Sequence, residues 1–372
     1  MKVIFTIDSL AQGGTEQSIA ELISHFNDHI QVIVVYFYNS HQLRSTYESI
    51  NCNLVYLNIN EKYGFYDAII KFSQVVVQEK PDAVVSSLYR SLIISRLVCW
   101  WKKIPLIGTF VNERYSAERK SRFKGISIIK YFSTWLLDRS TAFIPKKVIS
   151  NSYSISVSNG KALCIPPNKI KVIYRGRNTS NYPMWVRPAG KGKFVWIAIG
   201  RLIPQKGYEN LLQAFLMLKM KYTQVELRIL GEGSLQSELE ELIQKLNLKS
   251  DVKLEGNISF AWRHLYDSNA FVLPSVSEGF SGALVEALIT GIPLVASDIP
   301  MNLEAISPGK DAYFFRSNDS LDLYDKMDQL MNNYDSACEI GKLMRCRAIV
   351  NYDIRKVAND YAKTIETVVN GK

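Results

Sequence analysis

The sequence predicts an α/β protein with two domains, each a parallel sheet wrapped by helices on both faces. Apolar runs of strand length alternate with helical patterns from one end of the chain to the other, as in parallel-sheet folds. Several of these runs are apolar throughout, which is expected of strands buried on both faces. With 372 residues, the chain is too long for one ordinary core and suits two domains.

The strands and helices can be placed along the chain from these patterns. The expected strands are residues 3–7, 31–38, 54–57, 83–86, 106–110, 147–150 and 171–174 in the first half, and 194–199, 226–230, 252–255, 270–273 and 294–296 in the second. Helical patterns lie between most of them, including residues 16–26, 66–79, 208–218, 235–246 and 283–290.

A stretch rich in turn-forming residues, 177–192, interrupts this alternation and is the expected linker. We therefore predict a first domain over residues 1–180 and a second over 181–350. The remaining residues, 351–372, contain an amphipathic helical pattern at 353–369.

Positive charge is concentrated in the first half of the chain. Up to Trp185 there are 23 Lys and Arg against 12 Asp and Glu, a balance of +11; from Val186 onward there are 22 against 23, a balance of −1. A basic surface attracts nucleic acid, anionic lipid or phosphorylated substrates. Because no recognised nucleic-acid-binding motif accompanies the charge, no nucleic-acid partner is expected.

Other features point to a cytoplasmic protein without a metal centre. The five cysteines are scattered and form no CxxC pair, as in proteins with reduced core thiols. The apolar run at residues 1–7 meets Asp8 at once and predicts a first strand instead of a signal peptide. No apolar run approaches the ~18 residues of a membrane span. The four histidines lack the spacing of metal ligands.

The most informative segment is Glu278-Gly-Phe-Ser-Gly-Ala-Leu-Val-Glu286, which follows an apolar strand and opens a helix. The first N–H groups of a helix have no partners within it, so such a turn can bind an anion. A carboxylate at each end suits a ligand with both phosphate and hydroxyl groups, such as a nucleotide sugar. The simpler alternative is that Glu278 complements the helix dipole and Glu286 is a solvated surface residue.

Three further strand-to-helix turns carry glycine or cations. Gly13 and Gly14 follow the first strand, where they would let a phosphate approach the backbone, although the spacing is not that of a dinucleotide fingerprint. Arg201 and Lys206 follow the strand at 194–199 and could neutralise a diphosphate as it departs. The turn with Gly231 and Gly233 is a weaker signal, for contact with a base or ribose.

The chain resembles the retaining glycosyltransferases of family 4 in the order of its motifs, which are Gly13-Gly14-Thr15-Glu16, Gly200-Arg201, Lys206-Gly207, Gly231-Glu232-Gly233 and Glu278-x7-Glu286. The likeness extends over nearly the whole chain, with residues 291–298 completing it in the second domain. It implies a GT-B fold: two doubly wound Rossmann-like domains facing across a cleft, with a C-terminal helix that crosses back to the first domain.

The resemblance also implies roles for individual residues. Arg201 and Lys206 would hold the donor diphosphate, Glu278 the sugar hydroxyls and Glu286 the ribose. Gly14 would let the first domain close over the phosphate. The backbone N–H groups that would contact phosphate and sugar belong to Phe280, Ser281, Gly282, Ala283 and Leu284. The family implies a nucleotide-sugar co-substrate, commonly a UDP-sugar, and needs no cofactor or metal.

The first domain departs from the family in one respect. Many relatives carry a histidine near the donor sugar after the strand that corresponds to residues 106–110, and this chain has Asn112, Glu113 and Arg114 instead. These three residues are candidates for the acceptor side. Glu113 is also the one carboxylate worth naming for a double displacement. We favour front-face attack, in which the departing phosphate accepts the acceptor's proton and positioning and charge stabilisation supply catalysis.

The expected product is a cell-surface polysaccharide, such as capsule or O-antigen, or a glycolipid. Residues 114–135 mix cations with large apolar side chains, so contact with anionic membrane and a lipid-linked acceptor is a hypothesis; an ordinary helix packed in the core is the alternative. Two other functions stay open: a nucleotide-sugar epimerase of the same fold, and a two-lobed sugar- or nucleotide-binding protein without catalytic activity.

Overall fold

The computed structural model describes residues 1–50, 52–60, 64–115, 120, 125–189, 192–306 and 312–371. The chain divides into two compact units. The first contains Met1–Asn178 together with Asp353–Lys372, and the second contains Thr179–Tyr352.

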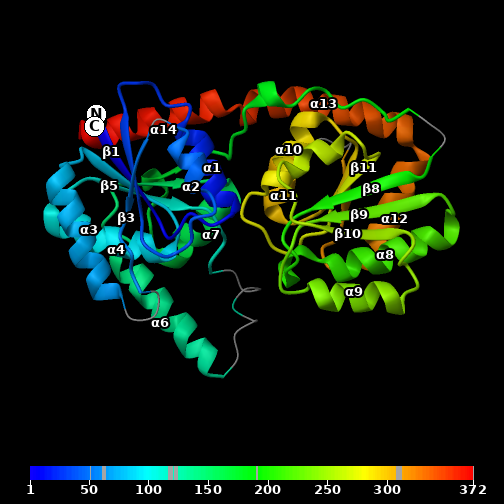
Figure 1. The fold of residues 1–372 in the computed structure, drawn as a ribbon, viewed down its shortest axis with the longest axis horizontal. Coiled ribbons are helices and arrows are strands. Elements are labelled where there is room, and N and C mark those ends of the chain that lie inside the picture. Colours follow the sequence, from blue (N-terminus) through cyan, green and yellow to red (C-terminus); the bar gives the residue numbers. More distant parts are fainter. Residues whose placement is uncertain are drawn as a thin grey trace. The chain divides into compact units, whose positions relative to one another are not determined.

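The described residues of the first unit form a seven-stranded parallel sheet of order β3-β2-β1-β4-β5-β6-β7. Figure 1 shows the elements of this unit in blue to green, with the last helix in red. The order reverses between β1 and β4, which is where open α/β sheets bind ligands. The strands are β1 (Lys2–Ile7), β2 (Gln31–Tyr36), β3 (Cys52–Tyr56), β4 (Ala83–Ser86), β5 (Leu106–Phe110), β6 (Lys147–Ser150) and β7 (Ile170–Val172). The helices are α1 (Gly14–Ile23), α2 (Arg44–Glu48), α3 (Phe65–Glu79), α4 (Tyr89–Lys102), α6 (Ile126–Thr141), α7 (Tyr153–Leu163) and α14 (Ile354–Val369).

The apolar strands of this sheet supply two cores, one on each face. Side chains alternate across a strand, so Phe5 of β1 lies in one core cluster and its neighbour Ile4 in the other. The first cluster is covered by α1 and α14, which contribute Leu22 and Ile365 among others. The second is covered by α3 and α4. This double coverage explains why apolar residues predominate in the strands, with polar residues mostly at strand ends.

The described residues of the second unit form a six-stranded parallel sheet of order β10-β9-β8-β11-β12-β13. Here the order reverses between β8 and β11. The strands are β8 (Phe194–Ile199), β9 (Val225–Leu230), β10 (Val252–Gly256), β11 (Ala270–Leu273), β12 (Leu294–Ser297) and β13 (Tyr313–Phe315). The helices are α8 (Tyr208–Lys221), α9 (Gln236–Lys245), α10 (Gly282–Thr290), α11 (Pro300–Ile306), α12 (Ser320–Asn332) and α13 (Tyr334–Tyr352).

The predicted linker at 177–192 is divided between the units: residues 177 and 178 belong to the first, and 179–189 and 192 to the second. Residues 190 and 191 lie outside the described part. The Trp185 side chain is 5% exposed. Its backbone N–H donates to the Thr290 carbonyl at 2.8 Å and its indole N–H to the Ser268 carbonyl at 3.0 Å. The first residues after the unit boundary therefore belong to the core of the second unit.

The last helix belongs to the first unit, as the family resemblance implies. Asp353 caps its N-terminus by accepting the backbone N–H of Arg355 at 2.9 Å. Val357 and Ile365 then enter the same core cluster as β1 and α1. None of the described helices combines the length and hydropathy that crossing a bilayer requires.

Candidate functional site

Three loops of the second unit gather at the carboxyl edge of its sheet. They follow β9, β8 and β11, which are neighbours in the sheet, and the reversal of strand order lies between β8 and β11. Hydrogen bonds join the loops: the N–H of Val276 donates to the Gln205 carbonyl at 2.8 Å, and the N–H of Leu202 to the Glu232 carbonyl at 2.9 Å. The motifs after β8, β9 and β11 therefore form one continuous surface.

Three glycines allow this close approach. Gly207 has φ +67°, and a Cβ there would collide with the Pro274 carbonyl oxygen of the β11 loop. Gly231 has φ +146°, and a Cβ there would collide with the Gly200 carbonyl oxygen. At Gly233 the neighbour is the backbone of Leu202. Glycine is therefore required here for packing of loop against loop, whether or not a ligand also approaches Gly231 and Gly233.

Lys206 and Glu278 form an ion pair at this edge, between the β8 and β11 loops. Their side chains are 14% and 10% exposed. The Ser275 hydroxyl donates to the same Glu278 oxygen at 2.7 Å and helps to fix the carboxylate. The Tyr208 hydroxyl donates to the Gly200 carbonyl at 2.9 Å. Burial, with a contribution from the charge of Glu278, raises the pKa of this hydroxyl well above its usual value, so it stays protonated.

The remaining predicted donor-side residues surround this pair on the same segments. Arg201 is exposed on the β8 loop. Ser281 caps α10 by accepting the backbone N–H of Leu284 at 3.4 Å, so that donor already has a partner. The N–H groups of Gly282 and Ala283 also lie at this positive helix end. Glu286 is half-buried on the second turn of α10.

The Phe280 side chain faces the core of the second unit. Its side chain is 2% exposed and packs edge-on against Tyr352, with ring centroids 5.6 Å apart. Only its backbone could face a ligand, which is the role that the family resemblance assigns to it.

In the first unit, Gly13 and Gly14 lie where β1 turns into α1. Gly13 is the N-cap of that helix, and the Glu16 carboxylate lies against it, where a Cβ would otherwise be. A Cβ on Gly14 would be 3.5 Å from Nη1 of Arg175, which follows β7. A guanidinium and a helix N-terminus thus lie near each other at this carboxyl edge, an arrangement that favours anions, and the Glu16 carboxylate already lies at the helix end.

Comparison with known families now identifies the chain. The sequence model for glycosyltransferase family 4 matches residues 12–181, and the model for glycosyl transferases group 1 matches residues 184–345. Together they match most of the chain. The chain belongs to these glycosyltransferases.

Relatives and solved structures agree with this assignment. An uncharacterized glycosyltransferase, MJ1059 of Methanocaldococcus jannaschii, is 37% identical over 61% of this chain and 58% of its own length. An N-acetylgalactosamine-N,N'-diacetylbacillosaminyl-diphospho-undecaprenol 4-alpha-N-acetylgalactosaminyltransferase of Campylobacter jejuni is 35% identical over 36% of each chain. The matches therefore span about a third to three-fifths of these relatives' lengths.

The structure of Anabaena Alr3699/HepE in complex with UDP superposes with a TM-score of 0.82 over 99% of this chain and 100% of that chain, at 19% identity. This likeness concerns the fold, which is that of GT-B glycosyltransferases.

The structure brings together some of this glycosyltransferase's predicted residues and leaves others apart. Lys206 and Glu278 are in direct contact, which sequence spacing alone did not predict. Asn112 is exposed on the loop after β5, whereas Arg114 is only 13% exposed and reaches inward to Asp138. Of the basic segment 114–135, residues 116–119 and 121–124 lie outside the described part.

Two participants were missed from the sequence. Ser275 could have been suspected because it closely follows a buried strand on the same loop as Glu278. Asp138 gave no local signal, because its partners are 23 to 42 residues away.

Proposed function

We propose that this chain is a retaining glycosyltransferase that moves a hexosyl group from a nucleotide sugar, UDP-linked, to a saccharide or lipid-linked acceptor of surface-polysaccharide synthesis. One observation carries the proposal: Lys206 and Glu278 meet at the point where strand order reverses in the second unit, beside the N-terminus of α10. A diphosphate that binds Lys206 places its attached sugar within reach of Glu278, because the two side chains already touch. UDP in a neighbour of the same fold supports the choice of nucleotide.

The donor side follows from this geometry. Arg201 and Lys206 neutralise the diphosphate as it leaves, together with the N–H groups at the start of α10, so no metal ion is needed. Glu278 accepts hydrogen bonds from the sugar hydroxyls, and Glu286 from the ribose. The α-linkage in the printed name of the Campylobacter relative is the product that retention gives from an α-linked nucleotide sugar.

The reaction is a front-face displacement. The bond between the anomeric carbon and the phosphate oxygen breaks, the acceptor oxygen bonds to the same face, and the departing phosphate takes the acceptor's proton. Replacement of Glu113 by Gln separates this route from a double displacement. The front-face route expects partial activity to remain, whereas a covalent intermediate on Glu113 requires that almost all activity be lost.

The test begins with thermal-shift measurements on UDP-, GDP-, ADP- and dTDP-sugars, followed by nucleotide release with candidate acceptors.

Lys206→Ala should reduce turnover by about 10²- to 10³-fold, because it removes a charge that stabilises the leaving group. Lys219→Ala is the matched control, since Lys219 also pairs with a carboxylate of the second unit, Asp251, at 2.8 Å. Equal losses of melting temperature and activity in Lys206→Ala would contradict the assignment. Turnover without any acceptor would favour an epimerase.

Helix α6 supports a membrane-bound acceptor and a peripheral location at the cytoplasmic face. Its exposed side carries Ile129 (68% exposed) and Leu136 (60%), seven residues apart and so on one face, beside Phe132 (43%). Lys130 and Arg139 flank this face. The one acid within Ile126–Thr141 is Asp138, which is buried. An apolar stripe between cations, with no exposed acid, suits an anionic bilayer surface.

Vesicle flotation tests this part separately. The protein should float with vesicles that contain phosphatidylglycerol and remain behind with phosphatidylcholine alone. Leu136→Ser should weaken flotation, whereas Met220→Ser, which removes an apolar side chain 81% exposed on the second unit, should not. Flotation independent of anionic lipid would refute membrane docking and leave the sugar-transfer proposal untouched.

A further inference from the structure

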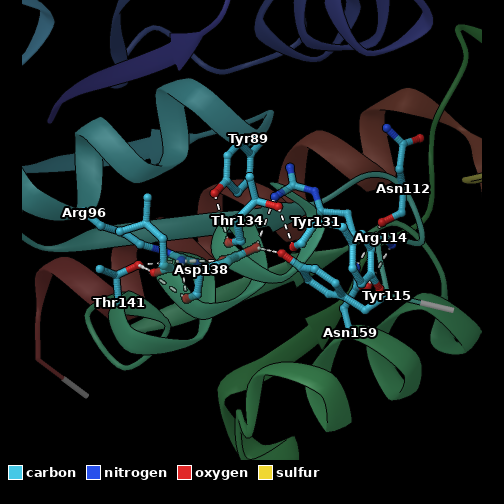
Figure 2. Close-up of polar contacts among 11 residues, drawn as sticks. Tyr89, Arg96, Asn112, Arg114, Tyr115, Tyr131, Thr134, Asp138, Thr141 and Asn159 are labelled. Atoms are coloured by element: carbon cyan, nitrogen blue, oxygen red, sulfur yellow. Dashed lines mark hydrogen bonds and ion pairs between the residues drawn. The ribbon is translucent and has the colours of Figure 1, made fainter. Parts of the chain in front are cut away.

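A buried charge pair joins two helices of the first unit. Asp138 lies on the inner face of α6 and Arg96 on α4, with side chains 1% and 0% exposed. Nη1 of Arg96 donates to Oδ1 of Asp138 at 2.6 Å, to its carbonyl at 3.0 Å and to Thr141 at 3.1 Å (Figure 2). Burial lowers the pKa of Arg96, and the Asp138 carboxylate acts against this shift.

This pair is a poor source of stability for the fold. Nε and Nη2 of Arg96 are buried without a hydrogen-bond partner in the described structure. Desolvating two charges offsets much of their attraction, so an apolar pair of similar volume would stabilise two packed helices as well or better. Stability alone therefore does not account for a charged residue at position 138.

The second oxygen of Asp138 shows that role. Oδ2 accepts the Tyr115 hydroxyl at 2.5 Å and Nη1 of Arg114 at 3.4 Å. Both residues end the described part of the loop after β5, and Figure 2 shows both side chains directed at Asp138. The Arg114 guanidinium also lies over the Tyr89 ring, 5.1 Å from its centroid.

The rest of this loop is held by side chains in the same way. Nδ2 of Asn159, a residue of α7 that is fully buried, donates to the Asn112 carbonyl at 3.0 Å, and its Oδ1 accepts the Arg114 N–H at 3.1 Å. Nδ2 of Asn151 donates to the Val111 carbonyl at 3.0 Å. These hydrogen bonds hold the backbone of the loop in one conformation, while the Asn112 side chain is exposed.

We propose that Asp138 is a positioning residue, which sets the loop 111–115 for the acceptor through Tyr115 and Arg114. The proposal rests on the proposed function and on the prediction from the sequence that Asn112, Glu113 and Arg114 lie on the acceptor side. Oδ1 of Asp138 accepts the hydrogen bond from Arg96 that joins α4 to α6, and Oδ2 accepts those from the loop. The two roles can therefore be separated by mutation of the loop residues.

Tyr115→Phe removes the Oδ2 hydrogen bond and retains the ring and the buried ion pair. Its matched control is Tyr89→Phe, which removes a hydroxyl of the same cluster that donates to the Thr134 carbonyl of α6 at 3.0 Å and not to the loop. Amide hydrogen exchange on the full chain without ligand is the first readout. The backbone amides of residues 112–115 should exchange about ten-fold faster in Tyr115→Phe, which is the effect expected from the loss of one hydrogen bond to a charged group. Their exchange rates should not change in Tyr89→Phe.

The second readout uses a UDP-sugar and a short-chain polyprenyl-diphosphate sugar as probes. In Tyr115→Phe the KM for the acceptor should rise about ten-fold, with UDP-induced thermal stabilisation unchanged. The proposal is overturned if the amide exchange rates of the loop do not change in Tyr115→Phe. It is also overturned if these rates rise while the KM for the acceptor stays the same. Failure of every donor to be turned over would refute the proposed function, while the exchange result would still decide whether Asp138 holds the loop.

Discussion

Gly207 illustrates, at the scale of one residue, why the donor-side loops need glycine. Its positive φ and the adjacent Pro274 carbonyl act together, because a side chain there would be strained and would also collide. We expect Gly207→Ala to lower the free energy of unfolding by about 2–3 kcal/mol, from strain and collision combined. Urea unfolding measures this loss.

Gly256 offers the control, since it has φ +72° but no atom within 4 Å of the position that a Cβ would occupy. Gly256→Ala should cost about 1 kcal/mol, from backbone strain alone. Equal losses in the two variants would show that the collision with Pro274 does not matter.

Cysteine reactivity tests burial directly. Burial raises the pKa of Cys52 to about 11 and that of Cys99 to about 12, so both are almost entirely thiols at pH 8 and react slowly. Cys164 and Cys346 are exposed. Alkylation of the native protein at pH 8 should label these two cysteines first, as measured by peptide mass mapping. In urea all five cysteines should be labelled. Early labelling of Cys99 would mean that α4 is not packed as described.

At the same scale, local sequence patterns select the candidate donor-side residues but not the contacts between them. Lys206 and Glu278 could be selected because each follows a strand at a glycine-containing turn, which is a local pattern. Their contact, and the part played by Ser275, depend on which strands are neighbours in the sheet. The inward direction of Arg114 was unpredictable for the same reason, since Asp138 is 24 residues away.

Between elements, a bidentate ion pair joins two neighbouring strands of the second unit. Nε and Nη2 of Arg228 on β9 donate to the two Glu255 oxygens on β10 at 2.6 and 3.0 Å. These hydrogen bonds lower the pKa of Glu255 below its ordinary 4.5. A lowered pKa in the folded state means that the stabilisation is present above about pH 4.5 and is lost as pH falls through the folded value.

Glu255→Gln should therefore flatten the dependence of unfolding free energy on pH below about pH 4.5, while its effect near neutral pH stays near 1 kcal/mol for a partly exposed pair. Denaturant titrations at several pH values give the comparison. A variant whose acid profile overlays the wild type would show that this pair contributes nothing to acid stability.

Most elements were predictable because their patterns are local. The apolar runs of β4, β5, β6, β8 and β11 have the expected bounds, since their ends are marked by polar or turn residues. The short strand β13 was missed, because three residues, Tyr313–Phe315, carry too little pattern and depend on pairing with β12. Helix α13 was missed because its apolar residues do not form one clear stripe.

For the molecule as a whole, the final helix closes the first core. Ile365 is fully buried in the cluster that contains β1 and α1. We expect Ile365→Ala to destabilise the first unit by about 2–5 kcal/mol through cavity formation. Hydrogen exchange should rise in peptides of β1 and β4 and remain unchanged in β8 and β9. Leu343→Ala, at a side chain 60% exposed, is the control. A uniform rise across both units would contradict their division.

Because the last helix belongs to the first unit, the order of synthesis on the ribosome differs from the order of the units. The 174 residues of Thr179–Tyr352 are translated between the two segments that make up the first unit. At 5–20 residues per second, this interval lasts roughly 10–35 s. The half of the protein made first is therefore the last to complete its core, and during that wait its unfinished apolar face is the part of the nascent chain that a chaperone would find.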